Sequence, residues 1–184
     1  MESEITLEGL SSFGHYHIFA FTWWSDFYTG GFEYDRHSWG RTLGAQMDYV
    51  GEVLPVVILV QPAKTDLFGD PLTTAKRVVL GVGITPIGLR MMWRSDKSFK
   101  PYFIMKGGML GFTRKALSNY ASYQNFSLQI GLGMQIKLTD RYDTRVGYSD
   151  FHFSNAFMTP NNPGLDVMSH NAGIAYHLGK RVAR

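Results

Sequence analysis

The sequence predicts an all-β protein, an eight-stranded antiparallel transmembrane β-barrel of the outer-membrane type, with residues 1–184 forming a single β-barrel domain. Three observations predict it. One segment alternates apolar and polar residues without a break over a length that would span a membrane. Short and long connections alternate between the expected strands. Only 18% of the residues are charged and 15% are aromatic, a balance with less charge than most soluble domains carry.

The clearest strand covers residues 126–138. One face of it is apolar and consists of Phe126, Leu128, Ile130, Leu132, Met134, Ile136 and Leu138, and the residues between them are polar or glycine. A period of two is typical of a strand and excludes a helix. Most strands have ~5–6 residues, whereas a tilted strand needs ~9–11 residues to cross a bilayer. The length of this segment therefore favours a membrane barrel.

The other expected strands repeat the pattern less regularly, and their phase slips near Pro86. The eight strands are expected at 4–14, 20–36, 41–59, 77–94, 101–114, 125–138, 142–155 and 168–179. Connections near 37–40, 95–100 and 139–141 are short, and those near 60–76, 115–124 and 156–167 are longer, as in outer-membrane barrels. An even number of strands puts both ends of the chain on the side of the short turns. Because proline cannot donate to a ladder, we expect a bulge at Pro86.

The polar face of these strands carries charges of both signs, which in a barrel of eight strands would fill the lumen and pair with one another. They are Glu8, Glu33, Asp48, Glu52, Arg90, Lys106 and Arg145. Aromatic residues gather towards the strand ends, among them Trp24, Trp39, Tyr102, Phe112 and Tyr142, as in the aromatic girdles of a membrane barrel. The alternative fold is a soluble lipocalin-like barrel, whose apolar face would point inward around a ligand.

Composition limits the possible functions. A net charge of +3 is too small to indicate nucleic-acid binding, and the absence of cysteine excludes a disulfide framework and a cysteine-based metal site. The first residues lack the basic and apolar regions of a signal peptide, so the protein either stays inside the cell or the sequence is a mature form. We expect no metal and no organic cofactor.

Three side chains late in the sequence are those of a serine esterase: His152 as base, Ser154 as nucleophile and Asp166 as acid. Residues i and i+2 of a strand share a face, with Cα atoms about 6.6 Å apart, so the imidazole can reach the hydroxyl. Asn155 and Asn162 offer amides as oxyanion donors or loop braces. If the strand keeps its phase, His152 and Ser154 face lipid. A bulge before Phe151 would turn them into the lumen instead.

His152-x-Ser154-Asn155, followed by Asn162-Pro163-Gly164 and an acidic residue, resembles the signature of the lipid A 3-O-deacylase (PagL) family, often grouped with acyloxyacyl hydrolases. The resemblance implies an enzyme of the bacterial outer membrane. It would remove the ester-linked 3-hydroxyacyl chain at position 3 of lipid A, using a triad on the outer wall of the barrel. By this resemblance Ser154 is the nucleophile, His152 the base and Asp166 the acid, Asn162 helps to form the oxyanion hole, and Asn155 belongs to the motif.

Several alternatives stay open at this stage. Asp150 is a second candidate for the triad acid, although as a neighbour along the strand it would have to curl over to reach the far side of the imidazole. The expected partners are lipid A or lipopolysaccharide as substrate and the surrounding outer-membrane lipids, with no nucleic acid, in a monomer or a homodimer. The alternative function is a non-enzymatic outer-membrane barrel that binds lipid or has a structural role.

Overall fold

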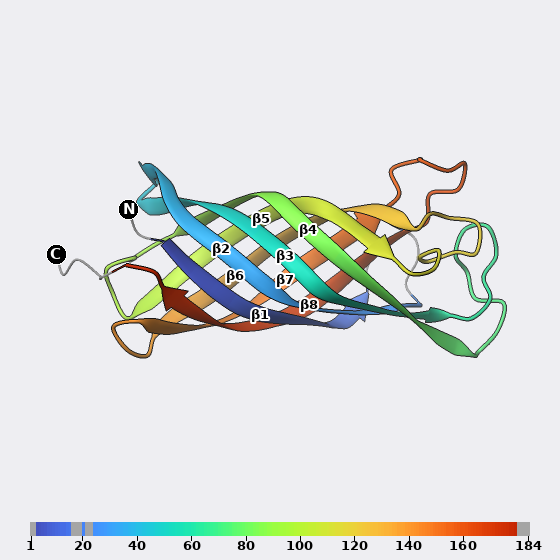
Figure 1. Cartoon of the computed structure of the whole chain (residues 1–184), viewed down its shortest axis with the longest axis horizontal. Helices are drawn as coiled ribbons and strands as arrows, with labels where there is room; N and C mark the ends of the chain where they lie inside the picture. The colour runs from blue at the N-terminus through green and yellow to red at the C-terminus, as the bar shows by residue number, and fades with distance from the viewer. Residues whose placement is uncertain (1–2, 16–19, 21–23, 180–184) are drawn as a thin grey trace.

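The computed structural model describes residues 3–15, 20 and 24–179, which form a closed antiparallel barrel of eight strands (Figure 1). Each strand pairs with its neighbours in the sequence, and the last strand closes the barrel against the first. The strands are β1 (Ser3–His15), β2 (Asp26–Thr42), β3 (Ala45–Pro62), β4 (Lys76–Met92), β5 (Phe99–Phe112), β6 (Gln124–Lys137), β7 (Tyr142–Ser154) and β8 (Gly164–His177). The predicted fold class is confirmed.

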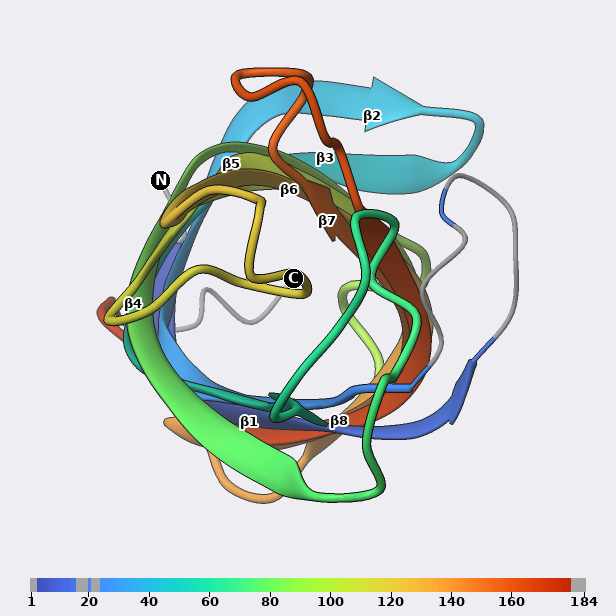
Figure 2. The ribbon, with the colours of Figure 1, turned by 90° about the vertical axis from the view of Figure 1, so that its right-hand side faces the viewer.

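Short and long connections lie at opposite ends of the barrel (Figure 1). The short ones follow β2, β4 and β6, and the start of β1 and the end of β8 lie at the same end. There the amide of Leu178 donates to the carbonyl of Ser3, at 2.9 Å. The longer connections follow β3, β5 and β7 at the other end. A view from that end shows the β5–β6 connection folding across the mouth of the barrel (Figure 2), with Ala116 and Leu117 buried.

Several predicted boundaries are wrong. The strand expected at 20–36 is β2, which begins only at Asp26. The short turn expected at 37–40 is part of β2, and the turn is formed by Leu43 and Gly44, both with positive φ. Gly40 also has a positive φ, but it lies within a register shift between His37 and Arg41, so it marks a bulge and not the turn. The predicted loop 156–167 is too long, because β8 begins at Gly164.

The bulge predicted at Pro86 is confirmed. The register between β4 and β5 shifts between Ile84 and Ile87, and both Pro86 and Ile87 face outward. The carbonyl of Pro86 accepts a hydrogen bond from the hydroxyl of Tyr49 on β3, at 2.7 Å. A side chain thus satisfies a backbone acceptor where the regular ladder is interrupted.

The outside of the barrel is apolar and the inside is charged, the reverse of a soluble barrel. Large apolar side chains are exposed on every strand, including Leu7, Phe32, Val53, Val82, Met105, Leu132, Val146 and Ile174. The soluble lipocalin-like alternative is therefore wrong, since it requires the apolar face inside. Within the part of the chain that the structure describes, no helix has the length and apolar character to cross a membrane.

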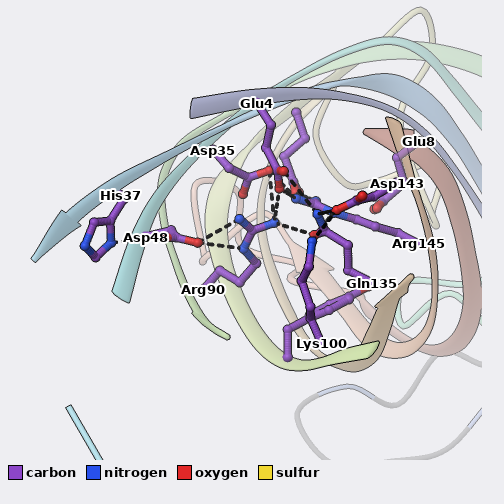
Figure 3. Close-up of polar contacts among 12 residues, drawn as sticks. Glu4, Glu8, Asp35, His37, Asp48, Arg90, Lys100, Gln135, Asp143 and Arg145 are labelled. Atoms are coloured by element: carbon purple, nitrogen blue, oxygen red, sulfur yellow. Dashed lines mark hydrogen bonds and ion pairs between the residues drawn. The ribbon is translucent and has the colours of Figure 1, made fainter. Parts of the chain in front are cut away.

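A network of ion pairs fills the lumen towards the short-turn end (Figure 3). The guanidinium of Arg145 contacts Glu4, Glu33 and Asp35, with N–O distances of 2.5 Å to the last two. The guanidinium of Arg90 donates to Asp48 at 2.7 Å and to Glu4 at 2.6 Å. The charged residues predicted to face the lumen are all buried, namely Glu8, Glu33, Asp48, Glu52, Arg90, Lys106 and Arg145. The prediction of a paired polar interior is confirmed.

The lumen becomes apolar towards the long-connection end, which the sequence analysis did not predict. Phe27 of β2 packs against Phe151 and Phe153 of β7, with ring centroids 4.7 Å and 5.1 Å apart. Phe112 joins them from β5, 5.7 Å from Phe153. Phe112 and Tyr102 were expected in the aromatic girdles, and both lie inside the barrel. Tyr102 fits there because Gly133 opposite has no side chain; a β-carbon would lie 2.4 Å from the phenol ring.

Candidate active site

His152 and Ser154 lie on the outer wall of the barrel, near the long-connection end of β7. The pairings of β7 with β6 and with β8 contain no register shift over their described length. Phe151 and Phe153 are buried in the apolar part of the lumen, so the residues that alternate with them must point outward. The strand therefore keeps its phase, and the alternative of a bulge before Phe151 is wrong.

Asp166 of β8 lies directly opposite His152 in the antiparallel pairing. Its Oδ1 atom is 2.5 Å from Nδ1 of the imidazole, within hydrogen-bonding distance. The His152 side chain is 17% exposed, whereas the carboxylate of Asp166 is fully buried. The cross-strand register thus brings together two side chains that are fourteen residues apart in the sequence.

The burial of Asp166 on an outward-facing position depends on the connection that follows β1. The backbone N–H of Ala20 donates to Oδ2 of Asp166, at 2.9 Å, and this bond is buried. Each carboxylate oxygen therefore has a donor, His152 for Oδ1 and Ala20 for Oδ2. Hydrogen bonds to both oxygens offset the cost of removing a negative charge from water.

Gly164 lies opposite Ser154 in the same pairing, where β8 begins. A β-carbon at this position would lie 3.3 Å from Cε1 of His152, 3.3 Å from Cβ of Ser154 and 2.9 Å from Cβ of Ala20. Such distances are shorter than ordinary van der Waals contact, so only glycine leaves room for these three neighbours. The imidazole edge and the serine side chain therefore border the same small space.

Asp150 shares the outer face of β7 with His152 but is located differently from Asp166. It pairs across the sheet with Met168 of β8 and Ile130 of β6, one step further from the rim. Of the two carboxylates considered for the triad, Asp166 is the one that contacts Nδ1 of His152. The geometry therefore favours Asp166 as the partner of the imidazole.

Asn155 follows Ser154 and braces the β7–β8 connection. Its amide nitrogen donates to Oγ1 of Thr159 and to the carbonyl of Asn161, both at 2.8 Å. Its amide oxygen accepts from the N–H of Phe157, at 3.0 Å. Both hydrogens of the amide group are thus used within the connection, which matches a supporting role and leaves none for an oxyanion.

The segment after Asn155 is a tight turn of unusual conformation. Ala156 and Phe157 both have positive φ, 48° and 61°, although neither is glycine, and the N–H of Met158 donates to the carbonyl of Asn155. Asn162 lies near the end of this connection and is half-buried, with its side-chain oxygen buried and without a hydrogen-bond partner among the described residues. The described residues thus supply no hydrogen-bond donor to this oxygen.

Two neighbours of the site, Ala20 and Gly164, were missed as functional residues by reasoning from the sequence. Ala20 acts through its backbone, which any residue except proline would provide, and it is 146 positions from Asp166, so no local signal could identify it. Gly164 was part of the motif Asn162-Pro163-Gly164, but its steric role becomes visible only once β7 and β8 are paired.

Possible metal ligands gather elsewhere in the described residues. The groups of three are Glu4, Asp143 and His177, and Glu8, Glu33 and Glu52, all inside the lumen. The first group already contacts Lys100, whose ammonium is 2.5 Å from Asp143, and the second contacts Lys106. On the outer wall, Ser154 and His152 both face outward from β7, and the buried carboxylate of Asp166 contacts the imidazole.

Comparisons with known proteins bear on the family and the fold. The chain matches the family described as lipid A 3-O-deacylase (PagL) over residues 14–175. Among solved structures it resembles the outer membrane enzyme PagL, with 16% sequence identity, a TM-score of 0.66, and coverage of 91% of this chain and 97% of that one. It also resembles the outer membrane protein OprG from Pseudomonas aeruginosa, with 12% identity, a TM-score of 0.56, and coverage of 96% of both chains.

A search among curated protein sequences gave no match. The likeness to the two solved structures shows the fold, which is that of outer-membrane barrels. The family match covers most of the chain, including the segment with His152, Ser154 and Asp166. The chain therefore belongs to the lipid A 3-O-deacylase (PagL) family.

Proposed function

We propose that this protein is an outer-membrane serine esterase that hydrolyses the ester-linked 3-hydroxyacyl chain at position 3 of lipid A. The observation that carries the proposal is the contact between His152 and Asp166, on an outward-facing wall and beside Ser154. Family membership supports lipid A as the substrate. The apolar outer surface supports a substrate that arrives through the membrane and not through the lumen.

In the proposed reaction, Ser154 Oγ attacks the carbonyl carbon of the acyl ester while Nε2 of His152 accepts its proton. Asp166 holds the opposite nitrogen, Nδ1, and stabilises the imidazolium that forms. Collapse of the tetrahedral intermediate breaks the ester bond, and His152 gives its proton to the sugar oxygen that leaves. A water molecule, activated by His152, then attacks the acyl-serine and releases a 3-hydroxy fatty acid.

The negative charge on the tetrahedral oxygen needs hydrogen-bond donors. We propose that the side-chain amide of Asn162 supplies one of them, because the connection that carries it begins directly after Ser154 and ends beside it at Gly164. Asn155 acts indirectly in this scheme, since both hydrogens of its amide already hold the connection in place. Removal of a single oxyanion donor costs about 10²–10³ in rate in other hydrolases.

The test is mass spectrometry of lipid A after incubation with the purified barrel. We expect the loss of one 3-hydroxyacyl chain, and we expect Ser154→Ala to reduce its release by at least about 10³-fold. Ser38→Ala, an exposed serine near the opposite end of the barrel, is the matched control and should keep full activity. Both variants should still migrate as folded barrels on unheated gels. Undiminished release by a folded Ser154→Ala variant would exclude the proposal. No release by the unmodified protein would favour a non-enzymatic lipid-binding barrel.

A further inference from the structure

Asp166 faces outward from β8 but is fully buried, and the covering comes from the chain that follows β1. β1 pairs with β8 as far as His15, which lies opposite Val167, one residue short of Asp166. Beyond that point, the backbone N–H of Ala20 donates to Oδ2 of Asp166, at 2.9 Å. The side chain of Ala20 is also close to Gly164, since a β-carbon there would lie 2.9 Å from that of Ala20. This hydrogen bond and the close approach to Gly164 thus place Ala20 beside the site.

A carboxylate that bonds a histidine through one oxygen can still rotate about its Cβ–Cγ bond. A second hydrogen bond, to the other oxygen, removes that freedom. It also favours the ionised carboxylate, which is the form that orients an imidazole and stabilises its protonated state. In Asp166, Oδ1 contacts His152 and Oδ2 accepts from Ala20, so the two bonds together fix the plane of the carboxylate.

We infer that Ala20, through its backbone N–H, is a positioning residue that holds Asp166 in the orientation in which it bonds His152. Gly164 makes this possible, because a side chain at that position would separate Ala20 from the site. The effect on reaction rate rests on the proposed function. The effect on the hydrogen bond between His152 and Asp166 does not rest on it, and it can be measured separately.

The first experiment removes the donor. Ala20→Pro lacks the N–H, whereas Ala20→Gly keeps it. NMR of the barrel in detergent micelles should show the proton between His152 Nδ1 and Asp166 far downfield of the amide region, identified by its loss in Asp166→Ala. We expect this signal to shift or disappear in Ala20→Pro and to persist in Ala20→Gly. An unchanged signal in a folded Ala20→Pro variant would overturn the inference, whether or not the protein hydrolyses lipid A.

The second experiment does not require the proline variant to fold. The amide proton of Ala20 should be protected from hydrogen exchange in the unmodified barrel, because it is buried and bonded to Asp166. We expect its exchange to become at least about tenfold faster in Asp166→Ala, while amides in the middle of β6 keep their protection. Equal exchange rates for Ala20 in the two proteins would count against the bond as the anchor.

The rate of lipid A deacylation gives the third measurement. Loss of a hydrogen bond to a charged group corresponds to about a 10- to 100-fold change, which we expect in kcat of Ala20→Pro with KM within about threefold. When Asp166→Ala is already present, Ala20→Pro should have little further effect, since its role is exerted through that carboxylate. Thr74→Pro, in the exposed β3–β4 connection, is the proline control and should keep its activity. Fully additive losses would show a general loss of structure and overturn the inference.

Discussion

Asp166 carries a buried carboxylate on a wall whose other outward residues are mostly apolar, so its position needs a specific reason. Its contact with His152 and the N–H of Ala20 account for both of its oxygens. Asp150, two residues from His152 on the same strand, is half-buried and lies opposite Met168. The difference between the two acids comes from the cross-strand register, because a residue directly opposite reaches Nδ1 more easily than a neighbour along the same strand.

The first prediction separates these two acids. Asp166→Ala should lower kcat for deacylation by about 10⁴-fold, because His152 loses the group that fixes its tautomer and stabilises its protonated form. Asp150→Ala should lower it by less than about tenfold. The measurement is the rate of 3-hydroxy fatty acid release by each variant, with folding checked on unheated gels. A larger loss in Asp150→Ala than in Asp166→Ala would reassign the acid.

A short motif and a family resemblance predicted Ser154, His152 and Asp166 as the catalytic residues. The sequence could not choose between Asp166 and Asp150, because that choice depends on the register of β7 against β8, which no pattern within one strand specifies. It also could not decide whether β7 keeps its phase. That phase is set by Phe151 and Phe153, which pack in the apolar part of the lumen near the long-connection end. Residues of other strands, such as Phe27 and Phe112, build this part of the lumen.

At the level of elements, the side chain of Asn155 braces the β7–β8 connection, together with the hydroxyl of Thr159, which donates to the carbonyl of Asn161. Asn155 makes three hydrogen bonds within residues 155–161, and they brace a turn in which Ala156 and Phe157 adopt positive φ. Positive φ costs free energy for residues other than glycine, so the turn requires external support. The turn begins one residue after Ser154, and its conformation therefore affects the surroundings of this side chain.

The second prediction concerns this support. Asn155→Ala should lower kcat by about 10- to 100-fold, because a relaxed turn displaces Asn162 and the surroundings of Ser154, while the barrel stays closed. Asn155→Asp keeps the acceptor for Phe157 but loses both donors. Its kcat should therefore lie between those of the unmodified protein and Asn155→Ala. The measurement is kcat together with the midpoint of thermal unfolding. A change in the midpoint with no change in kcat would contradict this role.

The strands themselves were mostly predictable. Alternation identified all eight, and proline with its phase slip located the bulge at Pro86. Two of the errors in the strand boundaries occurred at glycines, which serve in turns, in bulges and at strand ends. Gly40 looked like a turn and is a bulge, and Gly164 looked like a loop residue and opens β8. Glycine at a turn, at a bulge and at a crowded strand end cannot be distinguished without knowing the neighbours.

At the scale of the whole molecule, the stability of the barrel depends on the charged residues in the short-turn half of its lumen. Arg145 of β7 contacts the carboxylates of Glu4, Glu33 and Asp35. These residues lie on β1 and β2, beyond the pairing of β8 with β1 that closes the barrel. It also lies over the ring of Tyr102, 5.9 Å from the centroid. One guanidinium thus neutralises charges from two strands that are not sheet neighbours of its own strand, β7.

The third prediction tests this network. Arg145→Ala should destabilise the barrel by about 3–5 kcal/mol, since three buried carboxylates lose their common partner. The matched control is Lys97→Ala, which breaks an exposed ion pair with Asp96 in the β4–β5 turn and should leave the stability nearly unchanged. The measurement is the urea midpoint of unfolding in lipid vesicles, followed by the gel mobility of the folded form. Equal midpoints for the two variants would contradict the network's role.

The pairing of β1 with β8 determines when Asp166 can be anchored during assembly of the barrel. His152 meets Asp166 only after β8 has paired with β7, and Ala20 reaches Asp166 only after β1 has come round to β8. The first and last strands of the chain must therefore both be in place before the carboxylate is anchored. In a chain whose sheet is still open between β1 and β8, Asp166 therefore lacks the bond from Ala20, although His152 and Ser154 already share β7. Under the proposed function, the site would reach its full activity only when the barrel is complete, so membrane lipids would meet a fully anchored carboxylate only in a finished molecule.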